Sequence, residues 1–330
     1  ARRDLPRRRM DSLPDGYVTL LSLISHEYFH TWNVKRLRPR DLDPIDPSRE
    51  NETRLLWFFE GFTSYYDDLA LLRTGLIDLE RYLKLLSKCV QAVAATPGRH
   101  VQSVAEASFE AWTKFYKGDE NTPNITVNYY QKGALLGLAF DLSLRRDGSS
   151  LDALMRELWR VSQGGPIDEA DIAQALQKVA GRSYHAELAS WVHGTEELPL
   201  SELLADLGIH WRQERAGLGA ALGLRVSEGA LTGVQVKAVL RGGAAAAAGV
   251  SAGDELLAVD GWRLRRLDDA AQWIEPGQPF QLLVSRDQRV LTLTVQPQAD
   301  SPFSALAALH QAAPLGGDET AARRRAWLGA

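Results

Sequence analysis

The sequence predicts an α+β protein in which a mostly helical domain precedes a small, β-rich domain. As far as about residue 200, apolar residues recur at the three- and four-residue spacing of amphipathic helices. From residue 217 to 298, short alternating runs such as LGLRVSE, GVQVKAV and FQLLVSR are separated by turn residues, which is typical of strands. The length of 330 residues fits two domains of roughly 100–200 residues each.

The helical part divides at prolines, glycines and capping residues. A loop rich in proline and aspartate at 39–50 separates the first two apolar segments, and Asn51 or Thr53 is a candidate cap for the second. Gly61 would cost about 1 kcal/mol against alanine inside that second helix, which indicates close packing. Asp78 is the expected cap of the third helix. We expect helices over residues 17–34, 51–73, 78–94, 127–144, 150–162 and 168–180, and a short one over 184–193.

The change of pattern near residue 200 sets the expected domain boundaries. Two helical stretches, at 244–250 and 267–274, interrupt the strands of the second domain. The segment after residue 298 is rich in alanine and contains GG and RRR, so we expect weak order there. The expected division is a helical domain at 1–200, a linker at 201–216, a β domain at 217–298 and a weakly ordered tail at 299–330.

Composition excludes several classes of function. A formal net charge of −4 and a pI near 6.0 argue against a protein that binds nucleic acid through its overall charge. No apolar run reaches the roughly 20 residues of a membrane-spanning helix. Cys89 is the only cysteine, so no internal disulfide forms. The cysteine count does not decide the redox compartment, but the lack of disulfides favours the cytoplasm. Residues 1–9 contain five arginines without a following apolar segment, unlike a secretory signal peptide.

An HExxH motif at residues 26–30 predicts a metal site. On a helix, His26 and His30 lie one turn apart on the same face, where both imidazoles can bind one zinc ion. Glu27 lies beside that face and can accept a proton from water that the metal polarises. The motif arises by chance in roughly one chain in a hundred, so a buried helix with two hydrogen-bonded histidines is the alternative.

A third ligand is expected from the next helix. Glu60 stands in the aromatic run WFFEGF, where an isolated carboxylate is costly unless it is paired or binds metal. The alternative is a salt bridge, for instance to Arg54 or Lys35. Asp67 and Asp68 follow on the same helix, and we interpret them as groups that support the ligands or lie on the surface.

A tyrosine near the metal would stabilise the oxyanion of a tetrahedral intermediate. Tyr130, in the run YYQKG that enters a later helix, is the candidate. Aromatic residues at the start of a helix are more often part of the core, so the spacing alone leaves that alternative open.

Several long motifs in order resemble one enzyme family over residues 15–297. They are HEYFHTWNVKRLRP, RLLWFFEGFTSYYDDLALLRTGL, TPGR, SFEAWTKFY, DENTPN and NYYQKGAL. Together they resemble the glycyl aminopeptidase family of zinc metallopeptidases. The resemblance implies a thermolysin-like (gluzincin) helical catalytic domain followed by a PDZ domain. It also implies similarity to the larger aminopeptidase-N-like enzymes, which share the HExxH, EGxTxY and YxKG patterns.

The resemblance assigns roles to the candidate residues one by one. It implies that His26, His30 and Glu60 are the zinc ligands. It implies that Glu27 is the general base and that Tyr130 is the oxyanion-stabilising tyrosine of the YxKG pattern. It further implies a preference for substrates with a small N-terminal residue, glycine above all.

The β domain resembles a PDZ domain of the bacterial type. Leu222, Gly223 and Leu224 precede a strand and resemble the loop whose backbone N–H groups bind the C-terminal carboxylate of a peptide. A peptide would then add as a strand beside residues 224–228. The alternative is a domain with an empty groove that only packs on its neighbour.

The family carries an N-terminal β domain and a GGxEH-type segment before the HExxH helix, and neither is present here. We therefore expect that this chain begins just after that segment. The main hypothesis is a zinc aminopeptidase that acts on peptides. The alternatives are a PDZ-bearing, peptide-binding module with a structural zinc site, and a zinc endopeptidase. The ligand set also accepts other divalent metals.

Overall fold

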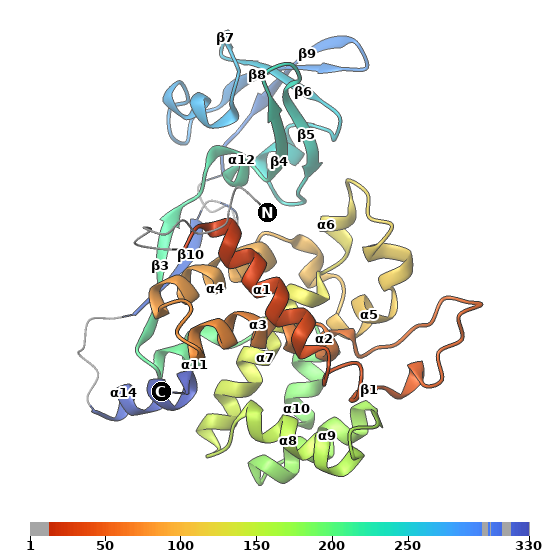
Figure 1. The fold of residues 1–330 in the computed structure, drawn as a ribbon. Helices are drawn as coiled ribbons and strands as arrows, with labels where there is room; N and C mark the ends of the chain where they lie inside the picture. The colour runs from red at the N-terminus through yellow and green to blue at the C-terminus, as the bar shows by residue number, and fades with distance from the viewer. Residues whose placement is uncertain (1–12, 299–302, 304, 312–317, 330) are drawn as a thin grey trace.

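The computed structural model describes residues 13–298, 303, 305–311 and 318–329, and Figure 1 shows the helical domain below the β-rich one. The helical domain contains long helices joined by short helical turns. Its elements are α1 (Asp15–Phe29), β1 (Arg38–Pro39), η1 (Arg40–Leu42), α2 (Leu56–Phe59), α3 (Gly61–Arg73), α4 (Leu79–Ala94), η2 (Pro97–His100), α5 (Val104–Phe109), η3 (Ala111–Phe115), α6 (Thr122–Ile125), α7 (Tyr129–Arg146), α8 (Leu151–Ser162), β2 (Pro166–Ile167), α9 (Glu169–Ala180), α10 (His185–Glu187), η4 (Leu188–Val192) and α11 (Leu200–Ala205).

The expected helices are present, with differences at the first two. The first ends at Phe29 rather than near residue 34, because the chain turns at His30. The second begins only at Leu56 and is interrupted at Glu60, between α2 and α3. Neither Asn51 nor Thr53 caps it, since its first turn has no side-chain cap. Asp78 does cap α4, as expected, by accepting a hydrogen bond from the Arg81 N–H at 2.8 Å.

The core of the helical domain is built on α7, which is buried along most of its length and packs against α3. The two helices touch through backbone at Gly61 and Gly133: a Cβ atom added to Gly61 would lie 2.4 Å from the Gly133 Cα. The close packing expected at Gly61 is thereby confirmed. The contact lies next to Glu60, at the junction of α2 and α3, and one helical turn after Tyr130 on α7.

The β-rich domain is an antiparallel sheet with the order β4-β5-β6-β8-β9, and β7 pairs with β6. Apolar side chains on alternate positions form its own core, which includes Val234, Val236 and Val284. The two expected helical stretches are short: one is α13 and the other is the 3-10 helix η5. The elements are α12 (Leu218–Ala221), β4 (Leu224–Gly229), β5 (Gly233–Val239), α13 (Ala244–Ala247), β6 (Glu255–Val259), β7 (Trp262–Arg263), η5 (Leu267–Gln272), β8 (Phe280–Arg286) and β9 (Arg289–Val295).

The expected linker and tail differ from the structure wherever it describes them. α11 and β3 (Ile209–Arg215) occupy the linker, and β10 (Ala305–Gln311) from the tail pairs antiparallel with β3. The last helix, α14 (Asp318–Leu328), buries Trp327, whose Nε1 donates to the Tyr65 hydroxyl at 2.8 Å. The alanine-rich composition hid this order, because a strand that pairs through its backbone needs few large side chains. The rest of the tail lies outside the described residues.

Among the helices that the structure describes, none combines the length and the apolar content that crossing a bilayer requires.

Candidate active site

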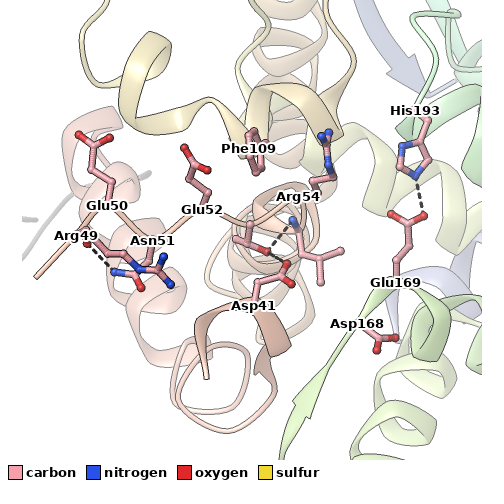
Figure 2. Close-up of a pocket in the computed structure, with 12 residues that line it drawn as sticks. Asp41, Arg49, Glu50, Asn51, Glu52, Arg54, Phe109, Asp168, Glu169 and His193 are labelled. Atoms are coloured by element: carbon pink, nitrogen blue, oxygen red, sulfur yellow. Dashed lines mark hydrogen bonds and ion pairs between the residues drawn. The ribbon is translucent and has the colours of Figure 1, made fainter. Parts of the chain in front are cut away.

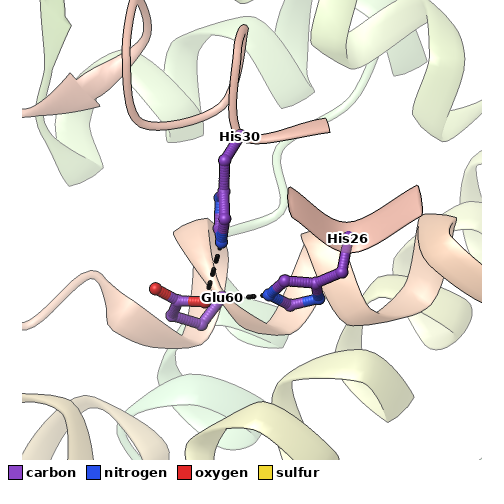
Figure 3. Close-up of side chains that lie close together, drawn as sticks. All are labelled: His26, His30 and Glu60. Carbon is purple, nitrogen blue, oxygen red and sulfur yellow. Dashed lines mark hydrogen bonds and ion pairs between the residues drawn. The ribbon is translucent and has the colours of Figure 1, made fainter. Parts of the chain in front are cut away.

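His26, His30 and Glu60 converge on one point, as Figure 3 shows. His26 lies in the last turn of α1, and His30 caps the end of that helix. Glu60 lies at the junction of α2 and α3. Its Oε2 is 3.3 Å from the Nε2 of His26 and 3.2 Å from the Nε2 of His30. The ligand atoms of the three residues lie within 4.8 Å of one another, close enough to share one metal ion.

A hydrogen bond at Nδ1, the ring nitrogen that faces away from Glu60, orients each histidine. The Nδ1 of His26 is 3.1 Å from Oδ2 of Asp67, and the Nδ1 of His30 is 2.9 Å from the backbone oxygen of Asn33. When Nδ1 carries the proton and donates it, Nε2 is left with a lone pair that points at the shared centre. The prediction that Asp67 supports the ligands is thus matched by its position.

The sequence did not single out Asn33, although it lies three residues after His30. Its side chain is fully buried, and its Nδ2 donates to the Phe59 carbonyl and to the Thr63 hydroxyl, both at 3.2 Å. Asn33 thereby ties the end of α1 to the α2–α3 junction that carries Glu60. The only signal in the sequence is a polar residue shortly after the motif, and it becomes informative once α1 is known to end at Phe29.

The charges of this cluster balance one another. Burial would raise the pKa of Glu60, but the hydrogen bonds with His26 and His30 outweigh it and lower the pKa to about 2. Burial would lower the pKa of His26, yet its hydrogen bonds with Asp67 and Glu60 raise it to about 9. The pKa of Asp67 rises to about 7 because its carboxyl is buried. Protons on the imidazoles therefore compensate Glu60, a role that a divalent cation can take over.

The donor set fits zinc. Two imidazoles and one carboxylate are the protein ligands of many catalytic zinc sites, which keep a further position for water or substrate. Within the described part of the chain, this is the one group of histidine, cysteine and acidic residues close enough to hold a metal. Other divalent ions accept the same donors, so the ligand set alone leaves the metal's identity open.

Glu27 lies next to the metal ligands on α1 but takes no part in their hydrogen bonds. Its side chain is exposed, and it forms no hydrogen bond or ion pair with any residue that the structure describes. A carboxylate left free beside a candidate metal centre is available to accept a proton from water.

Tyr130 lies in the first turn of α7, beside the ligands. Its ring centre is 6.3 Å from that of His26. The Asn128 side chain caps α7 and accepts the Tyr130 N–H at 2.8 Å, which fixes the backbone there. Burial and the negative charge of Glu60 raise the pKa of Tyr130, so its hydroxyl stays protonated and can donate a hydrogen bond. Tyr129, in contrast, is fully buried and belongs to the core.

The predicted carboxylate-binding loop of the β domain lies at the end of α12. The N–H of Leu222 donates to the Leu218 carbonyl at 3.0 Å, and that of Gly223 donates to the Ala220 carbonyl at 2.8 Å. Two of the expected donors are therefore already used within α12. β4, which begins at Leu224, is at the edge of the described sheet, as strand addition by a peptide would require. Peptide binding here stays a prediction.

Among the cavities in the described part of the helical domain, one lies away from the candidate site residues and another adjoins them. The larger, of about 610 Å³, is lined by the 49–55 segment, Phe109, Glu169 and His193, and no candidate site residue reaches it (Figure 2). The smaller, of about 190 Å³, is lined by residues that include Asp67 and Tyr130. Free space thus adjoins the groups that surround the metal ligands.

Comparisons with known proteins show which families this chain is similar to. Residues 19–136 match the family model of the M61 glycyl aminopeptidases, and this range holds every candidate residue of the metal site. The resemblance to the glycyl aminopeptidase family is confirmed. Residues 235–286 match the model of the PDZ domain, so the β-rich domain is a PDZ domain.

Solved structures extend the comparison. A crystal structure of an aminopeptidase N family protein from Idiomarina loihiensis is 32% identical, with a TM-score of 0.88. That match covers 99% of this chain and 57% of the other, so the chain spans little more than half of that relative's length. The predicted architecture, a helical domain followed by a PDZ domain, agrees with it.

Two further matches are too distant to carry any structural conclusion. The HtrA-type protease AlgW with a decapeptide is 25% identical, with a TM-score of 0.21, over 25% of this chain and 28% of that one. A photosystem II D1 C-terminal processing protease is 20% identical, with a TM-score of 0.22, over 50% of this chain and 43% of that one. No curated protein sequence matches the chain.

Proposed function

We propose that the chain is the catalytic part of a zinc aminopeptidase that hydrolyses the N-terminal bond of peptides. The observation that carries this proposal is the convergence of His26, His30 and Glu60 at one point. Glu27 lies beside them and forms no hydrogen bond or ion pair with a residue that the structure describes. The match to the glycyl aminopeptidase family over residues 19–136 supports peptides as the substrates. The PDZ domain supports a second peptide contact, at its edge strand β4.

Each side chain has a distinct task in this proposal. When bound, zinc supplies a Lewis acid that polarises the substrate carbonyl and water. Glu27 accepts a proton from the attacking water and passes it to the leaving amine. The Tyr130 hydroxyl, kept protonated by its raised pKa, donates a hydrogen bond to the oxyanion. Asp67 holds the His26 ring in the tautomer that frees Nε2.

We also propose a preference for small N-terminal residues, glycine among them. The family resemblance is the main support.

The test compares hydrolysis of glycyl- and alanyl-anilides by the wild-type chain and by Glu27→Gln, with zinc measured in both. We expect wild-type turnover and a loss of about a thousandfold in kcat in the variant, which keeps a full zinc content because Glu27 is not a ligand. Equal activity of the two proteins would remove Glu27 from the reaction.

Two further outcomes separate the alternatives. Full zinc without turnover in the wild type would point to a PDZ-bearing, peptide-binding module with a structural zinc site. Cleavage of peptides with a blocked amine, as fast as that of free-amine peptides, would identify an endopeptidase.

A further inference from the structure

A buried asparagine joins the PDZ domain to the helical domain. Asn124, on α6, is 7% exposed. Its Nδ2 donates to the Val239 carbonyl at 2.9 Å, and its Oδ1 accepts the Arg241 N–H at 2.8 Å. Both ends of one side-chain amide thus pair with the backbone of the same PDZ loop. Figure 1 shows α6 on the side of the helical domain that lies nearest to β5.

On the PDZ side, the loop that Asn124 holds supports the predicted carboxylate-binding loop. The N–H of Leu240, between the two residues that Asn124 binds, donates to the Gly223 carbonyl at 2.7 Å. A Cβ atom added to Gly243 would lie 2.9 Å from the Gly223 Cα, so the two loops touch through backbone. The two hydrogen bonds of Asn124, which we call the Asn124 clamp, therefore hold a well-packed part of the PDZ domain.

On the helical side, α6 leads directly to the oxyanion candidate. Only residues 126–128 separate α6 from α7, whose second residue is Tyr130. The Thr126 hydroxyl donates to Gln102, and a Cβ atom added to Gly98 would lie 2.1 Å from the Thr126 carbonyl oxygen. Residues 126–128 are closely packed, so a displacement of α6 also displaces the first turn of α7.

We infer that Asn124 is a positioning residue: by fixing α6 to the PDZ loop at 239–241, it sets where Tyr130 stands beside the metal ligands. The PDZ domain then belongs to the framework of the active site. This inference rests on the proposed function for the role of Tyr130, whereas the mechanical link itself does not.

A second contact between the domains supplies a matched control. Arg225, on β4, donates to the Ala95 carbonyl at 3.4 Å and to the Thr96 hydroxyl at 3.2 Å. Its removal weakens the same interface at Thr96, just before η2, but leaves both hydrogen bonds of Asn124 to the PDZ loop in place. A general loosening of the interface is thereby distinguished from the path through Asn124.

The first readout needs no activity. Hydrogen–deuterium exchange of the amides of residues 122–131 is measured in the wild type, Asn124→Ala, Asn124→Asp and Arg225→Ala. Asn124→Asp conserves volume and the acceptor for Arg241, but sets a carboxylate oxygen against the Val239 carbonyl, so it tests the clamp even if the alanine variant folds poorly. We expect exchange about tenfold faster in both Asn124 variants and unchanged in Arg225→Ala. Unchanged exchange in either folded Asn124 variant would overturn the link.

The second readout is the kinetics with a glycyl-anilide. We expect kcat to fall by about three- to tenfold in the Asn124 variants, with KM and zinc content unchanged. In a Tyr130→Phe background the same substitutions should lower kcat no further, since the hydroxyl they misplace is gone. If the losses in kcat of the Asn124 and Tyr130 substitutions were fully additive, or if Arg225→Ala lost as much kcat as the Asn124 variants, positioning through Tyr130 would be contradicted. Inactivity of the wild type would contradict only the proposed function. The hydrogen–deuterium exchange of residues 122–131 would still test whether Asn124 holds α6 to the PDZ domain.

Discussion

Glu60 in the helical domain is a half-buried carboxylate and Asp254 in the PDZ domain a buried one, and the pKa of each is lowered, although burial by itself would raise it. Their partners differ. The Arg286 guanidinium donates to both oxygens of Asp254, at 2.7 Å each. Glu60 has two imidazoles instead, and both approach the same oxygen, Oε2.

The difference separates a structural ion pair from a candidate metal site. Asp254 is paired with a permanent cation, and the pair is complete within the protein. The partners of Glu60 are cations only while they hold a proton, and both are oriented from behind by Asp67 and the Asn33 carbonyl. An arrangement that aims three donors at one point, and balances charge with removable protons, is suited to exchange those protons for a metal ion.

Glu60→Ala should break the metal site most strongly. Removing one of three ligands is expected to lower zinc affinity by on the order of a thousandfold, so the purified variant should carry no stoichiometric zinc. Zinc is measured by atomic absorption after dialysis against a weak chelator. Asp254→Ala is the matched control, a buried carboxylate removed elsewhere, and it should keep its zinc. Stoichiometric zinc in Glu60→Ala would show that Glu60 is not a ligand.

Asp254→Ala should have its large effect on stability. It leaves Arg286 without its partner, and breaking such a pair costs about 3 kcal/mol in the free energy of unfolding of the PDZ domain. Hydrogen exchange of the β6 and β8 amides reports this domain separately from the helical one. Glu60→Ala should leave those amides unchanged. A loss below about 1 kcal/mol would mean that the pair behaves like a solvent-exposed one.

The parts of the site that the sequence predicted are those set by local spacing or by an unusual neighbourhood. His26 and His30 are one turn apart on a single helix, so their convergence follows from helical geometry. Glu60 stood out because a carboxylate among aromatic residues needs a partner. Gly61 indicated close packing, and the structure shows its backbone against Gly133.

What the sequence did not predict depends on contacts between distant segments. Asn33 reaches the α2–α3 junction because α1 ends at Phe29, and no capping residue in the sequence indicates that end. The pairing of β10 with β3 joins segments that lie about 90 residues apart, and an alanine-rich strand gives no periodic signal of it. The clamp of Asn124 on the PDZ backbone involves no partner side chain, so no residue type on the PDZ side marks it.

Asp67→Asn should have the smallest effect, because it changes a group that touches a ligand rather than the metal. The asparagine oxygen can still accept the Nδ1 proton of His26, so what is lost is mainly the negative charge behind the ring. Zinc affinity should fall by about ten- to a hundredfold. Asp68→Asn is the matched control: that carboxyl is also buried, with a raised pKa, but binds Ser22 at 2.6 Å and does not touch a ligand. Competition with a chromophoric chelator measures both, and equal losses in the two variants would mean that the general field of the acidic pair, and not the bond to His26, supports the metal.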